Sequence, residues 1–97
     1  MAILHLLQQH PNHGGLNPCL HRCGTDDALV LLEDAVYALL DTNDNGQRWQ
    51  LPTIPIYVLQ PHLQARGLQH LQLHDHTIVD MSDLVNLTAT YDSSIRW

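Results

Sequence analysis

The residues of this chain whose chemistry is most easily named are its two cysteines, Cys19 and Cys23. They stand four positions apart, whereas redox-active and zinc-binding cysteine pairs are commonly spaced as C-x-x-C. Two thiols do not complete a zinc site, and His21, which lies between them in sequence, falls on another face of a helix. The spacing therefore favours two buried core residues over a reactive thiol. If one thiol does react, we expect it to be Cys19, because the nearby helix N-terminus lowers a thiol pKa.

Histidines are the second candidate group. His74 and His76 flank Asp75 and would point the same way in an extended segment, as two metal ligands do. The sequence fixes no third ligand, so we interpret them as solvated and predict no metal site. His5 lies within an apolar segment and is expected to be a hydrogen-bonded histidine in the core or at an interface. We assign the other histidines to the surface: His10, His13, His21, His62 and His70.

Glu33 and Asp34 are the third candidate group, since they directly follow an apolar run and can act as a general acid and base. A helix-capping role explains Asp34 without catalysis, and we favour it, because an Asp side chain accepts a bond from a free N–H of the first turn. The motifs G-x-G-x-x-G, G-x-x-x-x-G-K-[ST], G-x-S-x-G and H-E-x-x-H are all missing from the sequence. We therefore see no complete active site and expect no cofactor.

The elements that position these residues can be read from the apolar pattern. Residues 28–32, ALVLL, form an unbroken apolar run that fits a strand buried on both faces. A short helix is expected to follow from Asp34 to residue 40. Further strands are expected at residues 2–7, 54–59 and 77–80, and further helices at residues 16–23 and 61–66 and after Asp80.

Strands and helices thus alternate four times, which predicts an α/β fold with a mostly parallel sheet and right-handed crossovers. The last helix carries an apolar stripe, and residues 91–97 are expected to form a tail. Because the helices are short and the domain is small, part of its apolar surface is expected to lack cover, which suits a subunit of an oligomer.

Size and charge limit the range of functions. The 97 residues suffice for one domain, and the formal charge of −6, with four arginines and no lysine, argues against binding of nucleic acid or of an anionic membrane. The N-terminal segment lacks the basic region of a signal peptide, and no stretch is long enough to span a bilayer. Two cysteines without such a signal indicate reduced thiols in a cytoplasm.

Four segments of the sequence, taken in order, resemble the TusB/DsrH family: MAILHLL, ALVLLEDAVYALL, IPIYVLQPHLQARGL and IVDMSDLVNLTATYDSSIRW, the last ending in Trp97. The resemblance covers nearly the whole chain, although the polar loop at residues 41–51 and the histidine-rich connector at residues 69–76 do not contribute to it. It implies a small DsrE-like, Rossmann-like α/β domain at residues 1–97, with a mostly parallel sheet of four to five strands flanked by short helices.

The resemblance also implies a function. Members of the family are the small subunit of a heterohexamer that holds two copies each of three related chains. In the TusBCD form, the complex takes persulfide sulfur from the carrier TusA and passes it to TusE, for 2-thiolation of the wobble uridine of certain tRNAs. In the DsrEFH form, found in sulfur-oxidising bacteria, a similar complex exchanges sulfur with DsrC. The main sulfur-carrying cysteine belongs to a sister subunit, TusD or DsrE, so this chain is expected to be non-catalytic alone.

Cys19 is the residue through which the resemblance bears on chemistry. DsrH-like members have a cysteine followed by leucine at the start of this helix, and here the chain reads Pro18-Cys19-Leu20, while some TusB-like chains lack the cysteine. The resemblance thus implies that Cys19 is a candidate auxiliary persulfide site, whereas Cys23 matches no family position and is interpreted as structural. We expect Cys19 to be at least partly accessible and more reactive than Cys23.

Three hypotheses follow for the function. The first is a TusB-like subunit of a cytoplasmic sulfur-relay complex, with TusC/TusD-like partner subunits, a TusA-like donor and a TusE-like acceptor, and with no direct contact to nucleic acid or membrane. The second is the DsrH-like role in sulfur oxidation, with DsrE/DsrF-like partners and DsrC. The third, from a different class, is a stand-alone metal- or nucleotide-binding module that uses His74, His76 and the strand ends.

Overall fold

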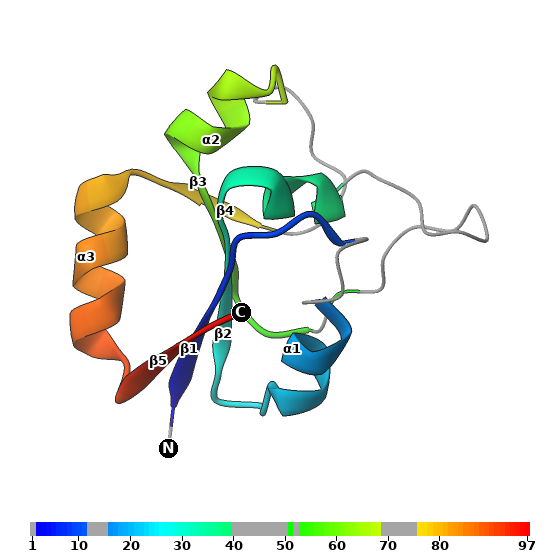
Figure 1. Cartoon of the computed structure of the whole chain (residues 1–97). Helices are drawn as coiled ribbons and strands as arrows, with labels where there is room; N and C mark the ends of the chain where they lie inside the picture. Colours follow the sequence, from blue (N-terminus) through cyan, green and yellow to red (C-terminus); the bar gives the residue numbers. More distant parts are fainter. Residues whose placement is uncertain (1, 12–15, 40–50, 52, 69–75) are drawn as a thin grey trace.

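The computed structural model describes residues 2–11, 16–39, 51, 53–68 and 76–97 of the chain (Figure 1). Within these ranges, five strands form one sheet in the order β4-β3-β2-β1-β5, and every neighbouring pair is parallel. The strands are β1 (Ile3–Leu7), β2 (Ala28–Leu31), β3 (Ile56–Leu59), β4 (Thr77–Val79) and β5 (Ser93–Arg96). The predicted α/β class, with a parallel sheet of four to five strands, is confirmed.

The middle strand of the sheet is β2. It pairs with β1 on one side and with β3 on the other, so that Val30 lies between Leu6 and Tyr57. All four of its residues are buried. A strand whose side chains are covered on both faces has no reason to alternate apolar with polar residues, which explains the unbroken run ALVL. The strand predicted from this run is therefore confirmed.

Helices cover both faces of the sheet. They are α1 (Leu16–Arg22), the 3₁₀ helix η2 (Glu33–Leu39), α2 (Gln60–Ala65) and α3 (Met81–Thr90). In Figure 1, α3 lies on one side of the sheet, and α1 and η2 lie on the other. Each side has its own cluster of buried side chains, because successive residues of a strand point to opposite faces. On β2, Leu29 and Leu31 face α1 and η2, while Ala28 and Val30 face α3.

Two helix ends follow the signals that the sequence carries. Gly67, two residues beyond the end of α2, has a φ of 68°, and its N–H donates to the carbonyl of Gln64. Glycine adopts this left-handed backbone without the cost that a Cβ imposes. At the start of α3, the Asp80 carboxylate accepts from the Asp83 N–H at 2.8 Å, and the Asp83 carboxylate accepts from the Asp80 N–H at 3.2 Å. The predicted cap at Asp80 is confirmed as a reciprocal capping box.

The helix after β2 differs from the prediction in type and in the role of Asp34. It is a 3₁₀ helix that begins at Glu33, whose φ of 50° is uncommon for a residue with a side chain. Asp34 lies inside this helix, and its Oδ1 accepts from Nε and Nη2 of Arg66 at 3.0 and 2.8 Å. The capping role predicted for Asp34 is wrong, because the fold places Arg66, the residue directly after α2, beside this carboxylate.

The C-terminal tail is a strand that the sequence analysis missed. β5 pairs in parallel with β1, and the pairing continues beyond it, since the Trp97 N–H donates to the Leu6 carbonyl at 2.8 Å. At its start, the Asp92 N–H donates to the Ala2 carbonyl at 3.0 Å. Three of its four residues are exposed, so the apolar pattern that identifies a strand is too weak here.

The apolar stripe of α3 is only partly covered. Leu84 and Leu87 pack against the buried residues on their side of the sheet. Met81 and Val85 are 56% and 63% exposed, and Ile78 of the neighbouring edge strand β4 is 40% exposed. The expectation of uncovered apolar surface is confirmed for this β4–α3 surface, which we define by Ile78, Met81 and Val85. None of the helices in the described ranges has the length and apolar character needed to cross a lipid bilayer.

Candidate functional site

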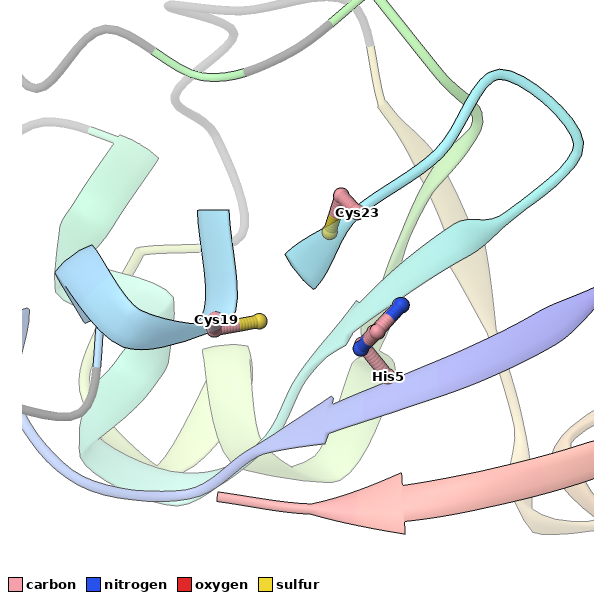
Figure 2. Close-up of side chains that lie close together, drawn as sticks. All are labelled: His5, Cys19 and Cys23. Atoms are coloured by element: carbon pink, nitrogen blue, oxygen red, sulfur yellow. The ribbon is translucent and has the colours of Figure 1, made fainter. Parts of the chain in front are cut away.

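The fold brings both cysteines to His5. One ligand atom from each of His5, Cys19 and Cys23 lies within 4.8 Å of the corresponding atoms of the other two. Cys19 lies on α1, Cys23 directly follows that helix, and His5 lies on β1. Figure 2 shows both sulfur atoms directed into the space between α1 and the imidazole ring. This Cys–His cluster, defined by His5, Cys19 and Cys23, is the candidate functional site.

The helix geometry explains how the two thiols come together. Residues four apart lie on the same face of a helix, and the Cys23 N–H donates to the Cys19 carbonyl at 3.1 Å, as in a continuing helical turn. That face of α1 packs on the sheet, so the Cys19 side chain is fully buried. Cys23 is only partly buried.

His5 is held by a hydrogen bond at each ring nitrogen. Its Nε2 lies 2.8 Å from Oδ2 of Asp27, and its Nδ1 accepts from the Trp97 indole N–H at 3.1 Å. Because an indole N–H can only donate, Nδ1 must carry the lone pair and Nε2 the proton that is donated to Asp27. The expectation that His5 is buried and hydrogen-bonded is confirmed, since its side chain is fully buried.

Asp27 is a functional candidate that the sequence analysis missed. In addition to His5, its carboxylate accepts from the N–H of Ile3 and of Gly24, each at 2.9 Å. Burial by itself would raise the pKa of Asp27, but the hydrogen bonds from Gly24, His5 and Ile3 outweigh it and lower that pKa. An ionised carboxylate therefore lies beneath His5. The only sequence signal for Asp27 was its place directly before an apolar strand, and acids are equally common at that place in ordinary loops.

The thiols are not activated in this arrangement. Burial, with smaller contributions from the charge and hydrogen bond of Cys23, raises the pKa of Cys19 from 9.0 to about 12. Burial also raises the pKa of Cys23. The expected partial accessibility of Cys19 is wrong, and the nearby helix N-terminus does not bring the pKa of this thiol below its ordinary value. The seven-residue helix α1 is short, and the loss of hydration at a fully buried thiol outweighs what its dipole supplies.

The acidic candidates lie away from this cluster. Asp34 forms an exposed ion pair with Arg66, and the Glu33 N–H donates to Nδ1 of His62 at 2.7 Å. His62, predicted at the surface, is partly buried and helps to hold the turn after β2. The two acids are exposed and serve this turn, so nothing in their surroundings favours the general acid and base alternative.

The other histidines are placed as follows. His21 is exposed, as predicted. His10 is partly buried, and its ring centroid lies 5.5 Å from that of Tyr37. His76 is described and partly buried, but the hypothesis of a metal pair in the connector falls outside the described residues, because His74 and Asp75 belong to the range that the structure leaves out. The same holds for His13 and His70.

Comparison with known protein families matches residues 11–94 to the family described as DsrH like protein. Among curated proteins, Protein TusB of Pectobacterium parmentieri is 33% identical to this chain, and the match covers 98% of this chain and all of that protein. Protein TusB of Escherichia coli strain K12 is 32% identical over the same shares.

Among solved structures, the ychN protein of E. coli superimposes on this chain with a TM-score of 0.75. The match covers 100% of this chain and 99% of the ychN chain. Its sequence identity is 19%, so this likeness concerns the fold alone. The Rossmann-like architecture expected from the sequence agrees with it.

Proposed function

Because the chain belongs to the DsrH-like family, we propose that it acts as a TusB-like subunit of a cytoplasmic sulfur-relay complex that serves tRNA modification. The observation that carries this proposal is the full-length relation to two proteins named Protein TusB. In this proposal residues 1–97 are one domain, which associates with TusC/TusD-like chains in a heterohexamer. The complex takes persulfide sulfur from a TusA-like carrier and passes it to a TusE-like acceptor for 2-thiolation of the wobble uridine.

The properties of the chain support a subunit rather than a free-standing enzyme. The described residues contain no thiol with a lowered pKa. After β2, the Asp34 carboxylate is paired with Arg66, and the Glu33 backbone N–H donates to His62. The charge of −6 suits contacts with proteins rather than with tRNA. The β4–α3 surface exposes three large apolar side chains beside an edge strand, and such surfaces are normally covered in an assembly.

Cys19 is our proposed auxiliary persulfide site in this relay. Its Sγ is fully buried in the isolated chain, so the proposal requires that α1 move when the chain meets its partners. Trypsin cleaves after Arg22 and so separates Cys19 in peptide 1–22 from Cys23 in peptide 23–48. After incubation of the assembled complex with a persulfide donor, we expect extra sulfur on peptide 1–22. Sulfur confined to peptide 23–48, or to the sister subunits, would remove Cys19 from the relay.

Coexpression with the TusC/TusD-like chains of the same organism tests the proposed function. We expect the three chains to purify together and the complex to restore 2-thiouridine in tRNA of a strain that lacks them. A charged substitution on the β4–α3 surface, Val85→Asp, should weaken this assembly, while Gln64→Asp on the exposed side of α2 serves as the matched control. A monomer that is fully active alone would refute the subunit role.

The DsrH-like role in sulfur oxidation is the second candidate. Cys19 is compatible with it, but this cysteine occurs in either branch of the family and does not by itself separate the two roles. Pro18-Cys19-Leu20 reproduces the cysteine that the resemblance assigns to DsrH-like members. Genes for a dissimilatory sulfite reductase beside this one, together with binding of the complex to DsrC rather than to a TusE-like protein, would support this role. Restoration of 2-thiouridine without any sulfur exchange with DsrC would exclude it.

A further inference from the structure

The Cys–His cluster contains a third potential metal ligand, which the sequence around the two cysteines does not provide. Two thiols spaced as C-x-x-x-C do not complete a metal site, but the fold adds an imidazole from β1 as a third ligand. Thiolate and imidazole are the ligands that thiophilic divalent cations such as Zn²⁺ prefer. Because His5 precedes the cysteines by 14 and 18 positions and lies on a strand, no sequence spacing indicates this grouping.

His5 is oriented in the manner of a metal-binding histidine. Such a histidine usually donates its other ring N–H to a carboxylate, which fixes its tautomer and makes the ligand nitrogen more basic. Here Nε2 donates to Asp27, whose carboxylate is itself held by the backbone N–H groups of Ile3 and Gly24. The lone pair is therefore on Nδ1, which accepts a hydrogen bond from the Trp97 indole N–H.

We propose that His5, Cys19 and Cys23 bind a thiophilic divalent cation, for which Zn²⁺ is the reference, with Asp27 as the residue that orients the histidine. Binding releases one proton from each thiol, and two thiolates with one Zn²⁺ and a neutral imidazole give a site with no net charge. A neutral site suits the buried position of Cys19 and His5, where an unpaired charge would be costly.

The geometry requires a small adjustment. Zn–S bonds of about 2.3 Å and Zn–N bonds of roughly 2.0–2.1 Å set the ligand atoms about 3.5–3.8 Å apart in a tetrahedral site. One ring nitrogen of His5 and the two Sγ atoms lie within 4.8 Å of one another, so these atoms must approach by no more than about 1.3 Å. The Trp97 indole must release Nδ1 for this to occur, and a fourth position is left for water or for an external thiol. This inference does not rest on the proposed relay. A Cys19 thiolate that binds the metal is not free to carry sulfur, so metal binding and the auxiliary persulfide role describe alternative states of the Cys–His cluster.

The test uses the full chain, reduced and freed of metal with a chelator. Zn²⁺ binding is measured by native mass spectrometry and by competition with a chromophoric chelator, and Co²⁺ reports thiolate ligation through its charge-transfer absorption. We expect one ion per chain and a thiolate–cobalt band. We also expect a change in tryptophan emission, absent from a Trp97→Phe variant, because the indole leaves Nδ1.

Variants separate this site from other histidines of the chain. Cys23→Ser, at a partly buried position, should weaken Zn²⁺ binding by more than the roughly 10–100-fold that loss of an outer-shell partner costs. His21→Ala, which removes the exposed histidine between the two cysteines, is the matched control and should bind as the parent chain does. Binding that survives Cys23→Ser but is lost in His74→Ala, or a cobalt complex without the thiolate band, would overturn the proposal.

Discussion

The burial of Cys19 makes a quantitative prediction about thiol reactivity. Thiolate is the form that reacts with alkylating agents. At about pH 8, a thiol with the ordinary pKa of 9.0 is roughly one-tenth thiolate, whereas a pKa of about 12 leaves roughly one part in ten thousand. The raised pKa alone therefore slows alkylation of Cys19 about a thousandfold relative to the unfolded chain. Because its side chain is 0% exposed, restricted access slows the reaction further.

Differential alkylation measures this effect directly. The native chain and the urea-unfolded chain are treated with iodoacetamide in the presence of a chelator, which removes protection by metal, and are then digested with trypsin. Since the chain has no lysine and Arg22 precedes Cys23, the two cysteines are read in separate peptides. We expect Cys23, which is partly exposed, to be labelled first, and Cys19 to react at least about a thousandfold faster in urea than in the native chain.

A Cys23→Ser variant identifies the cause of the protection. Burial is the largest contribution to the raised pKa of Cys19, and the charge and hydrogen bond of Cys23 are smaller ones. We therefore expect Cys19 to stay strongly protected in this variant. Labelling of Cys19 before Cys23 in the parent chain, or at a native rate within about tenfold of the unfolded rate, would refute the reasoning.

Three further predictions concern stability, measured by urea unfolding. Asp27→Asn should cost about 1–3 kcal/mol at neutral pH by weakening buried hydrogen bonds. Because folding lowers the pKa of Asp27, its contribution to the free energy of unfolding is present above the unfolded pKa of 3.8 and is lost as the pH falls through the folded value. If Asp27→Asn lost as much stability on acidification as the parent chain does, this reasoning would be contradicted. Leu31→Ala should cost about 2–5 kcal/mol, whereas Val85→Ala should change stability by less than about 0.5 kcal/mol. Asp80→Ala should cost about 0.5–2 kcal/mol through loss of the capping box, and an unchanged midpoint would show that the cap is not stabilising.

Elements whose residues carry their own signal were predicted from the sequence. The unbroken run at β2 requires cover on both faces, Gly67 permits a left-handed helix end, and Asp80 has its capping partner three residues on. Each of these signals lies within a few residues. They sufficed for the α/β class and for the eight elements from β1 to α3 that alternate along the chain.

The candidate site could not be predicted in the same way. His5 was expected to be buried and hydrogen-bonded, but its partners Asp27 and Trp97 lie 22 and 92 positions away. The Trp97 contact exists because β5 pairs with β1, and β5 carries too little apolar pattern to be identified. The expectation of an accessible Cys19 failed for a related reason, since spacing gives the helix face but not what that face packs against.

The sequence by itself determined that this chain alternates strands and helices around an apolar middle strand, because hydrophobic periodicity is a local property of the residues. Only the tertiary structure decided that His5 of β1 meets Cys19 and Cys23 of the α1 segment above an ionised Asp27. That grouping depends on the register of β1 against β2 and on the packing of α1 on the sheet. Both are set by burial of side chains from distant segments, to which no spacing in the sequence corresponds.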